Sequence, residues 1–506
     1  MVALSSSILH WARTQPERLA LSYGDTRVTY AQLAERTRAV AGVLKARGIG
    51  PGDIVALLMK NSAAFVELTL AIGHLGAVVL PINYRLGADE INYILGHAGA
   101  RLTCVDDEFQ ANVPAQAERV VLSSEHQHDA RRLDPTAEPV RDAHPAVPSD
   151  LFRLMYTSGT TDRPKGVTHT YENFYWKTLD HICELGLGAE DKLLVVGPLY
   201  HVGAFDLPGF ALFVAGGSLA ILRDFDAEPV LRAIDEHKLT GAWLAPVMLN
   251  RLLAYKERGA HDVTSLRWVV GGGERTPAER IQAFKSLFTH GRYIDAYGLT
   301  ETCSGDTMMQ AGMEIAKIGS AGLPLAHVRV EIRDGLGNRL PPNEVGEICL
   351  NGPKVTQGYW RDPERTQSSF FGAWFRSGDM GYLDEDGFLY LVDRKKDMVI
   401  SGGENIASSE VERVLYQLDV VEEAAVVGLP DERWGERVVA VVVPREGRTL
   451  TLEALQEYCR GKIGGFKIPK QLILLEALPR NPSGKVLKRV LREQLAVGEG
   501  NDSGAA

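Results

Sequence analysis

A stretch of thirteen residues, Met155 to Val167, combines the residue types that can hold a polyphosphate. Its sequence, MYTSGTTDRPKGV, contains four Ser or Thr hydroxyls, two glycines and the cations Arg163 and Lys165. Glycines leave backbone N–H groups accessible, hydroxyls donate hydrogen bonds, and the cations supply positive charge. The pattern G-x-x-x-x-G-K-[ST] is not matched, because no Gly-Lys-Ser/Thr follows at that spacing. The stretch predicts a phosphate loop of another kind, although its composition also suits an ordinary surface loop.

Two acidic residues further along the chain could complete a nucleotide site. Glu301, which follows Thr300, offers carboxylate oxygens to Mg²⁺, and Thr157 or Thr300 could add a hydroxyl. Asp379 follows a Ser-Gly turn, where a carboxylate can accept both hydroxyls of a ribose. A helix-capping role for Glu301 and a turn-forming role for Asp379 explain the residue types equally well.

Two further side chains could act on a substrate from outside these motifs. Lys485 ends the sequence Pro-Ser-Gly-Lys, a predicted mobile turn from which a long cation can reach a site formed by another domain. His201 follows Pro-Leu-Tyr among apolar residues. By residue type alone, Lys485 is equally an ordinary surface lysine and His201 an ordinary core histidine.

The elements that must position these residues alternate between strand and helix. Such β-α-β alternation implies a mostly parallel sheet that is covered by helices. The segment 110–148, rich in Pro, Asp, Glu and His, is predicted to be a peripheral connection. Apolar spacing predicts helices over 33–46, 64–75 and 227–237, and strands over 54–58, 77–81 and 218–222.

The texture of the sequence changes after about Ala326. Short strands with Gly and Pro turns predict a small β-rich subdomain that ends near Leu391, and a charge run, Asp393 to Asp397, follows it. We predict an α/β protein: a large N-terminal domain of helix-covered sheets over 1–393, a hinge over 394–397, and a small mobile α+β domain over 398–506. Beyond the hinge, helices are predicted over 409–418 and 452–463 and strands over 423–428 and 437–443.

Composition excludes several classes of protein. The 506 residues are 45% hydrophobic and 24% charged, which is typical of globular domains and excludes a small module or a coiled coil. The net charge of -10 provides no overall field for nucleic acid or anionic lipid. Five scattered cysteines without metal spacing predict reduced thiols. With no secretory signal and no apolar run of bilayer length, we expect a cytoplasmic protein without a transmembrane segment.

Five stretches, in the same order along the chain, resemble the motifs of the acyl-adenylate-forming superfamily, which includes acyl-CoA synthetases, luciferases and adenylation domains. The resemblance extends from about Ile8 to Leu495, nearly the whole chain. It implies an enzyme that uses ATP and Mg²⁺. The stretches are the loop 155–167, DAYGLTE at 295–301, RSGD at 376–379, Asp393-Arg394 with GGEN at 402–405, and PRNPSGK at 479–485.

The resemblance assigns a role to each candidate residue. Lys485 is expected to contact the acyl carboxylate and the ribose or bridging oxygen during adenylation, and Glu301 with Thr157 to hold Mg²⁺. Tyr297 is expected to face adenine, and Asp379 and Arg394 to contact ribose or phosphate. The other residues expected at ATP or at the pantetheine of CoA are Ser158, Gly159, Thr160, Thr161, Lys165, Gly273, Glu274, Arg275, Asp295, Thr300, Gly402 and Gly403.

Three positions depart from the family pattern. Asp162 stands where Gly is usual; Asp tolerates positive φ better than most residues, but its carboxylate near phosphate puts the ATP affinity in question. Glu274 and Arg275 stand where a small residue and Pro are usual, which leaves their contact with adenine open.

The resemblance also places an acyl pocket and a hinge. His201 is expected at the wall between that pocket and the thiol, and Lys396 at the hinge. The predicted lining is apolar or small, which suits an uncharged alkyl or aryl acid. Gly203 and the glycines 271–273 are predicted to leave volume for a substrate larger than acetate. The predicted lining is His201, Val202, Phe205, Trp243, Met248, Gly271, Gly272 and Cys303.

Several adenylating activities share these motifs. Domains that select amino acids carry Asp directly after the aromatic residue of F-D-x-S, whereas here Phe205-Asp206 is displaced by four positions. We therefore predict a carboxylic acid–CoA ligase that uses ATP, Mg²⁺ and CoA. An amide synthetase that passes acyl-AMP to an amine, or an enzyme that loads a carrier protein, is the alternative. A catalytically dead binding protein is disfavoured because Lys485 and Glu301 are both present. The predicted partners are small molecules and not nucleic acid, and a homodimer is left open.

Overall fold

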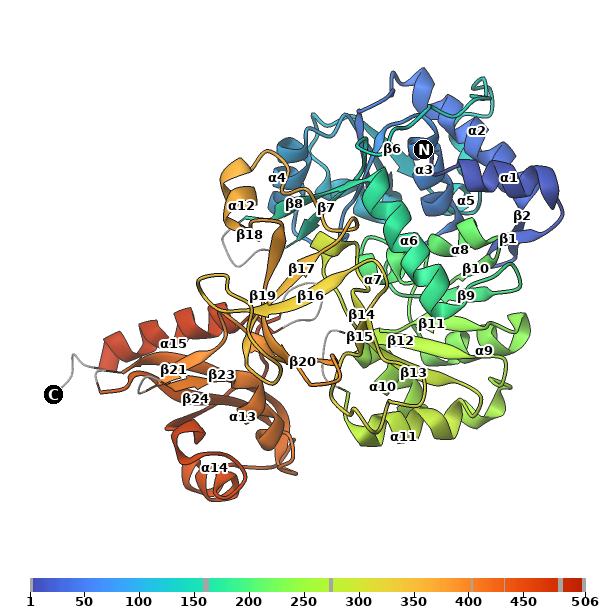
Figure 1. Ribbon diagram of the computed structural model, residues 1–506. Helices are drawn as coiled ribbons and strands as arrows, with labels where there is room; N and C mark the ends of the chain where they lie inside the picture. The colour runs from blue at the N-terminus through green and yellow to red at the C-terminus, as the bar shows by residue number, and fades with distance from the viewer. Residues whose placement is uncertain are drawn as a thin grey trace. The chain divides into compact units, whose positions relative to one another are not determined.

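The computed structural model describes residues 3–157, 163–272, 276–401, 404–431, 433–480 and 486–502 (Figure 1). The α/β class is confirmed. The chain divides into two compact units, one of 1–330, 350–375 and 386–389, the other of 331–349, 376–385 and 390–506. The boundaries of the hinge and of the C-terminal domain stay predictions.

A six-stranded sheet in the first unit carries the predicted phosphate loop. Its order is β6-β5-β3-β4-β7-β8, and neighbouring strands are parallel except for the antiparallel pair β7–β8. The central strand β3 is an unbroken apolar run that is buried throughout, as a parallel strand covered on both faces must be. The strands are β3 (Ile54–Leu58), β4 (Val78–Pro81), β5 (Leu102–Asp106), β6 (Arg119–Leu122), β7 (Leu151–Thr157) and β8 (Lys165–Thr170).

A second sheet in this unit has nine strands among the described residues. Its order is β15-β14-β13-β12-β11-β9-β10-β1-β2, with parallel pairing from β13 to β1 and antiparallel strands at both edges. The strands are β1 (Leu19–Tyr23), β2 (Thr26–Thr29), β9 (Lys192–Val195), β10 (Ser218–Ile221), β11 (Gly241–Trp243), β12 (Trp268–Gly272), β13 (Arg292–Tyr297), β14 (Thr307–Met308) and β15 (Leu323–Pro324).

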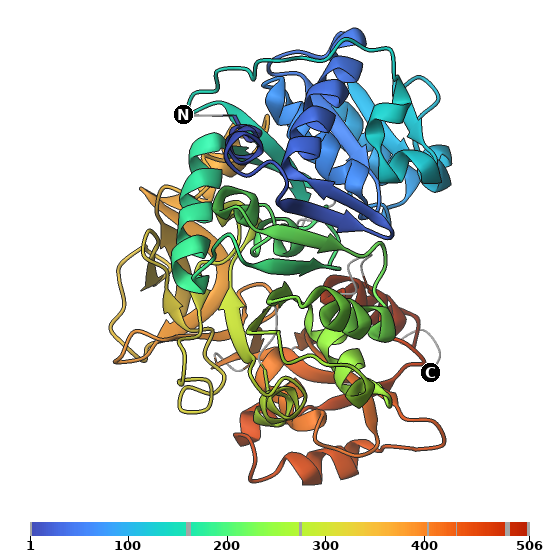
Figure 2. The same ribbon diagram turned by 90° about the vertical axis from the view of Figure 1, so that its right-hand side faces the viewer.

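Helices accompany both sheets, and their caps and apolar faces follow from the sequence. Asp226 caps α9, whose Ala227, Val230, Leu231 and Ile234 are buried on one face. In Figures 1 and 2, α6 is the long teal helix. The helices are α1 (Ser6–Thr14), α2 (Tyr30–Ala46), α3 (Ala63–His74), α4 (Ala88–Ala98), α5 (Ser124–His128), α6 (Tyr171–Leu185), α7 (Val202–Asp206), α8 (Ala211–Ala215), α9 (Ala227–His237), α10 (Pro246–Ala254), α11 (Ala278–Leu287), α12 (Pro363–Ser368) and the 3₁₀ helices η1 (Asp107–Asn112), η2 (Ala130–Leu133), η3 (Arg258–Ala260) and η4 (Thr300–Thr302).

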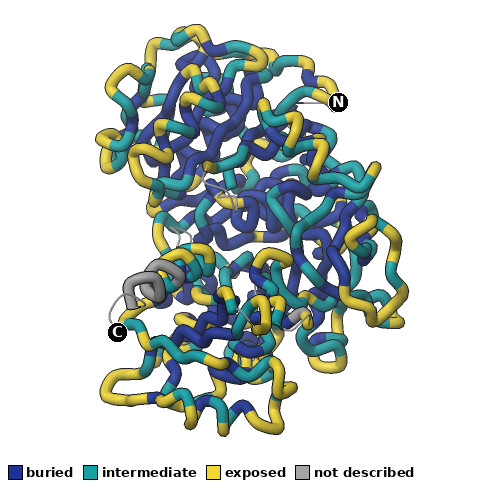
Figure 3. The backbone as a smooth tube through the Cα atoms, turned by 90° about the vertical axis from the view of Figure 1, so that its left-hand side faces the viewer, coloured by how far each residue is buried: buried dark blue, intermediate teal, exposed yellow. Residues whose placement is uncertain are grey.

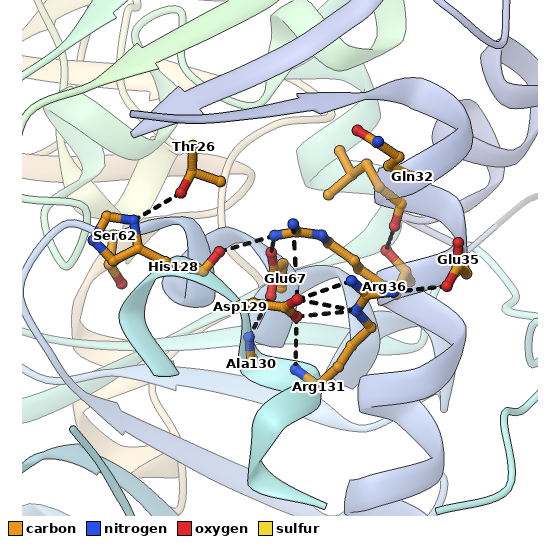
Figure 4. A network of polar contacts seen from close by, with 12 residues as sticks. Thr26, Gln32, Glu35, Arg36, Ser62, Glu67, His128, Asp129, Ala130 and Arg131 are labelled. Atoms are coloured by element: carbon orange, nitrogen blue, oxygen red, sulfur yellow. Dashed lines mark hydrogen bonds and ion pairs between the residues drawn. The ribbon is translucent and has the colours of Figure 1, made fainter. Parts of the chain in front are cut away.

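The segment 110–148 does more than connect. It supplies the edge strand β6, helix α5 and η2, and it is fixed to α2 and α3 by a polar network (Figure 4). Arg36 of α2 donates to the fully buried Glu67 of α3 at 2.7 Å and to the His128 carbonyl at 2.9 Å. Glu67 also accepts the Ala130 N–H at 2.7 Å. A buried carboxylate with these partners ties the segment to the helix layer.

The β-rich part and the C-terminal part each contain a five-stranded sheet. The first has the order β16-β17-β19-β18 with β20 beside β19, and the second β22-β21-β24-β23 with β25 beside β24. The elements are β16 (Arg329–Arg333), β17 (Gly346–Asn351), β18 (Phe370–Phe371), β19 (Trp374–Leu383), β20 (Leu389–Arg394), β21 (Val399–Ser401), β22 (Glu404–Ile406), β23 (Val421–Asp431), β24 (Gly435–Pro444), β25 (Gln471–Leu474), α13 (Ser408–Leu415), α14 (Leu452–Cys459), η5 (Gly465–Lys467) and α15 (Lys488–Asp502).

The buried parts of the backbone lie mainly in the interior, and the exposed parts lie mainly at the periphery (Figure 3). In the C-terminal sheet, Val426 and Val438 pack with α13 and α14 on one face, whereas Val427 and Val439 pack with Leu491 of α15 on the other. This alternation is the period of two expected for a strand. All five cysteines are unpaired, and Cys183 is the exposed one among them. In the described residues, no helix has the length and apolar character needed to cross a membrane.

Candidate active site

Strands β7 and β8 hold the two ends of the predicted phosphate loop. Thr157, the last residue of β7, is opposite Lys165, the first residue of β8. The hydroxyl of Thr157 is buried, without a hydrogen-bond partner among the described residues. The loop residues between these ends, Ser158, Gly159, Thr160, Thr161 and Asp162, lie outside the described residues.

Lys165 connects the end of this loop with Glu301. Its ammonium donates to Glu301 Oε1 at 2.6 Å and to the Tyr359 hydroxyl at 2.8 Å. Tyr359 in turn donates to Glu301 Oε1 at 2.9 Å, and the Thr356 N–H donates to the Glu301 carbonyl at 2.7 Å. Burial and then the charge of Glu301 raise the pKa of Tyr359, which keeps its hydroxyl a donor. Glu301 is thus fixed beside the loop. Thr300, its neighbour in η4, directs its carbonyl to a buried histidine described below.

The residues at this point suit Mg²⁺. That ion usually takes one or two carboxylates and completes its shell with substrate phosphates and water. Glu301 Oε2 has no protein hydrogen bond in the described part of the chain, and the buried Thr157 hydroxyl is without a partner. Over the same residues, no group of three or more His, Cys, Asp or Glu side chains could hold a metal alone. Substrate phosphates would therefore have to supply further ligands.

A cavity of about 330 Å³ opens beside Lys165 and Tyr359. Arg163 and Arg365 also line it, so three cations surround the space at the end of the predicted loop. Asp362, which lines it too, is paired with Arg365 at 2.9 Å. The net charge of this lining favours an anionic group such as a phosphate.

Strands β12 and β13 are adjacent and carry several of the predicted site residues. Gly271 is opposite Asp295, and Gly272 is opposite Ala296, while Tyr297 ends β13. A Cβ on Gly272 would lie 2.3 Å from the Ala296 carbonyl oxygen, so the close approach of the backbones requires glycine. Gly273, Glu274 and Arg275, which are predicted at ATP, lie outside the described residues.

Glycines near the predicted acyl pocket do not leave the volume that the sequence analysis predicts. His201 accepts the Gly203 N–H at Nδ1 (3.0 Å), and the Trp243 ring stacks against it at 6.0 Å. A Cβ on Gly203 would lie 2.4 Å from the Trp243 ring, and one on Gly271 2.0 Å from the Tyr293 hydroxyl. The predicted volume is wrong at these glycines, because they make room for Trp243 and Tyr293 and not for a larger acyl group.

The other predicted pocket residues are mostly packed against protein. Phe205 is fully buried, with its ring stacked on Phe210 at 4.3 Å. Cys303 is also fully buried, and burial raises the pKa of its thiol to about 12. Val202 is buried in α7, and Met248 packs at the margin of the core beside the second sheet. Their part in the acyl pocket stays a prediction.

A buried charge cluster that the sequence did not predict lies next to Phe205. Asp206 at the end of α7 accepts Arg153 at 2.7 Å and pairs with Lys177 at 3.1 Å, and all three side chains are fully buried. Burial by itself raises the pKa of Asp206, but the two cations outweigh it and hold the pKa at about 2. Arg153 stands between Phe152 and Leu154 in β7, a signal that it has a buried partner. Asp206 is occupied and cannot serve as the ammonium acceptor of an amino acid-selecting site.

His169 connects this cluster to Thr300, the residue before Glu301. Arg153 Nε donates to His169 Nδ1 at 3.0 Å, and His169 Nε2 donates to the Thr300 carbonyl at 2.6 Å. Burial and then the Arg153 charge lower the pKa of His169 to about 3. The histidine is therefore neutral in the folded protein at pH 7, and it connects β7 to η4.

Acid is expected to destabilise the fold through His169. Below about pH 6.5 the unfolded chain protonates this histidine, whereas the folded protein resists protonation down to about pH 3. The free energy of unfolding therefore falls as the pH drops. Each tenfold difference between the proton affinities of His169 in the unfolded and the folded state corresponds to about 1.4 kcal/mol. Urea unfolding from pH 7.5 to pH 4.5 should show a shallower decline for His169→Gln than for the wild type. His10→Gln, which alters an exposed histidine, is the control, and equal slopes for all three proteins contradict the prediction.

The predicted ribose residues lie together in the second unit. Asp379 in β19 follows Gly378, whose φ is +73°, and its carboxylate lies 3.4 Å from Arg394 Nε in β20. Lys396 is exposed in the turn that joins β20 to β21. Gly402, Gly403 and Lys485 lie outside the described residues. The roles of these residues stay predictions.

Comparisons with known proteins agree with the ordered motifs. Residues 8–360 match the model of the AMP-binding enzyme family, and residues 410–485 match that of the AMP-binding enzyme C-terminal domain. Feruloyl-CoA synthase of Amycolatopsis sp. is 37% identical over 96% of this chain and 97% of its own length. 2-Succinylbenzoate–CoA ligase of Geobacillus sp. (strain WCH70) is 35% identical over 99% and 100%.

The fold gives the same result. The structure of o-succinylbenzoate CoA synthetase (MenE) from Bacillus subtilis, in complex with the acyl-adenylate intermediate OSB-AMP, matches with a TM-score of 0.88 and 31% identity. The match covers 96% of this chain and 97% of that chain. The chain therefore belongs to the AMP-binding enzyme family, as its five ordered motifs predict.

Proposed function

We propose that this protein is an AMP-forming carboxylic acid–CoA ligase. It activates an uncharged alkyl or aryl acid with ATP, releases pyrophosphate, and transfers the acyl group from acyl-AMP to the thiol of CoA. The observation that carries the proposal is the contact of Lys165 and Tyr359 with Glu301 at the end of the phosphate loop. It places a cation and a carboxylate where a nucleotide triphosphate and Mg²⁺ need them.

The first step forms a mixed anhydride. A carboxylate oxygen of the acid attacks the α-phosphorus of ATP, the bond from that phosphorus to the bridging oxygen breaks, and pyrophosphate leaves. Bound Mg²⁺ neutralises phosphate charge. Lys165 and Arg163 supply positive charge to the departing phosphates, Glu301 with Thr157 holds the metal, and Lys485 stabilises the approach of two anions.

In the second step the deprotonated sulfur of CoA attacks the acyl carbon, and the bond from that carbon to the AMP oxygen breaks. Asp379 and Arg394 hold the ribose of the AMP, and His201 lies at the boundary with the thiol. Gly402 and Gly403 line the path of the pantetheine. CoA as the acceptor is supported by relatives that are named CoA ligases or synthases. This chain matches them over nearly their whole length.

The charge of the pocket lining supports an uncharged substrate. The segments 201–205 and 243–248 contain no Lys or Arg, and Arg153 and Lys177 behind them are held by Asp206. A second carboxylate would be buried there without a partner, at a cost of several kcal/mol. The relative named feruloyl-CoA synthase is named for an acid with one carboxylate and an aromatic ring, which supports an aryl acid.

A substrate panel tests the proposal. With ATP and CoA, kcat/KM should be higher for the best of octanoate, benzoate and cinnamate than for acetate or malonate by about 10²-fold, since each buried CH₂ contributes about 0.8 kcal/mol. Thioester formation and pyrophosphate release are measured together for each acid, with CoA and then with an amine as acceptor. A preference for acetate or malonate contradicts the pocket assignment. Pyrophosphate release that yields an amide and no thioester contradicts the choice of CoA.

A further inference from the structure

The turn that follows Glu301 has an uncommon backbone. Cys303, Ser304 and Gly305 have φ values of +55°, +66° and +64°, so three consecutive residues lie in the left-handed region. This region is unfavourable for residues with a Cβ, and Cys303 and Ser304 occupy it only if their surroundings hold them there. Both residues are buried, so the turn is held from inside the protein.

One buried lysine provides that hold. Lys354 is fully buried, and its ammonium donates to the Gly305 carbonyl at 2.5 Å and to the Ser304 carbonyl at 3.3 Å. It also pairs with the fully buried Asp306 at 3.0 Å. Asp306 accepts a short hydrogen bond from the Thr302 hydroxyl, one residue after Glu301. The two turn carbonyls thereby gain a donor inside the core.

The segment that contains Lys354 also holds Glu301 itself. Thr356 donates its N–H to the Glu301 carbonyl at 2.7 Å, and the Tyr359 hydroxyl donates to the carboxylate at 2.9 Å. Within six residues, 354–359, the segment therefore contacts the turn carbonyls, the Glu301 backbone and the Glu301 side chain. The resulting geometry fixes both the start and the end of the turn.

We propose that Lys354 is a positioning residue for the adenylation step. By holding the left-handed turn Cys303–Gly305, it keeps the Glu301 carboxylate oriented toward Mg²⁺ and the phosphates. The inference rests on the proposed function of Glu301. It adds that the orientation depends on a buried ion pair, Lys354–Asp306, that touches neither substrate nor metal.

The test removes the pair without leaving an unpaired buried charge. In Lys354→Met/Asp306→Asn, amides of 299–306 should exchange hydrogen for deuterium at least about 10-fold faster, because the Ser304 N–H bond to the Leu299 carbonyl (2.8 Å) and the Asp306 N–H bond to the Tyr297 carbonyl (2.7 Å) loosen. The Mg²⁺ concentration for half-maximal pyrophosphate release should rise by a similar factor. Adding Ser304→Gly should reverse much of both effects, because glycine adopts positive φ freely.

Other variants separate the possible outcomes. Ser304→Thr keeps the ion pair but places a β-branched residue at positive φ, so it should raise both readouts even if the double variant does not fold. Glu301→Gln should raise the Mg²⁺ requirement without faster exchange. An unchanged Mg²⁺ response in Glu301→Gln overturns the metal role of Glu301. If Glu301→Gln responds but Ser304→Thr and a folded double variant do not, or if Ser304→Gly restores nothing, the role of Lys354 is overturned and the function of Glu301 stands.

Discussion

The variant Lys485→Ala is expected to form acyl-AMP about 10³-fold more slowly than the wild type, the scale of losing one donor to a developing charge. The acid and ATP are both anions, and adenylation brings a carboxylate against a polyphosphate. A cation at that point stabilises the transition state of this step more than the separated reactants. Pyrophosphate exchange into ATP, with the preferred acid present, measures the first half-reaction alone.

The second half-reaction supplies the internal comparison. With preformed acyl-AMP, Lys485→Ala should make the CoA thioester at nearly the wild-type rate, because the removed cation acts on charge that is present only during adenylation. Lys470→Ala removes an exposed lysine near β25 and should leave both steps unchanged. An equal loss in both half-reactions would show that Lys485 has another role.

Helices and strands could be predicted from the sequence where the residue pattern of one segment determines its structure. The strand predicted over 54–58 is β3, and the helix predicted over 227–237 is α9, because an apolar run and an amphipathic period identify them. The helix predicted over 452–463 ends earlier, at Cys459. Arg460 is extended and Gly461 has φ +75°, and a backbone change of this kind interrupts a helix even where apolar spacing continues.

The partners of the candidate site could not be predicted in the same way. Lys165 and Glu301 were identified by their motifs, but the 2.6 Å contact joins residues 136 positions apart, and a periodic pattern contains no such pairing. Arg153 and Asp206 are 53 positions apart. Gly203 could not be interpreted from the sequence either. A glycine shows that a side chain is absent, but it does not show which neighbouring side chain occupies the space. Here Trp243 does.

The predicted hinge at Lys396 can be tested by a change in the backbone alone. Lys396 lies in the turn Lys395–Asp397, which is closed by hydrogen bonds from Asp397 and Met398 to the Arg394 carbonyl. If the C-terminal domain rotates here between adenylation and thioester formation, the backbone at this residue must adopt two conformations. Lys396→Pro fixes φ near -65° and permits only one of them.

Lys396→Pro is therefore expected to slow thioester formation from acyl-AMP by about 10²-fold, the scale of a small misplacement of reacting groups, while pyrophosphate release stays near the wild-type rate. Lys396→Ala is the matched control, since it removes the same side chain but leaves φ free, and it should retain both rates. Single-turnover experiments, started once with acid and ATP and once with acyl-AMP and CoA, measure the two steps separately. A wild-type rate of thioester formation in Lys396→Pro would mean that the rotation occurs elsewhere in the chain. An equal loss in Lys396→Pro and Lys396→Ala would assign the effect to the ammonium group, which both variants lack. A backbone hinge predicts that the rate falls only in Lys396→Pro and only in the reaction with CoA. The fixed φ angle of proline is the feature that Lys396→Ala lacks, so it alone accounts for such a result.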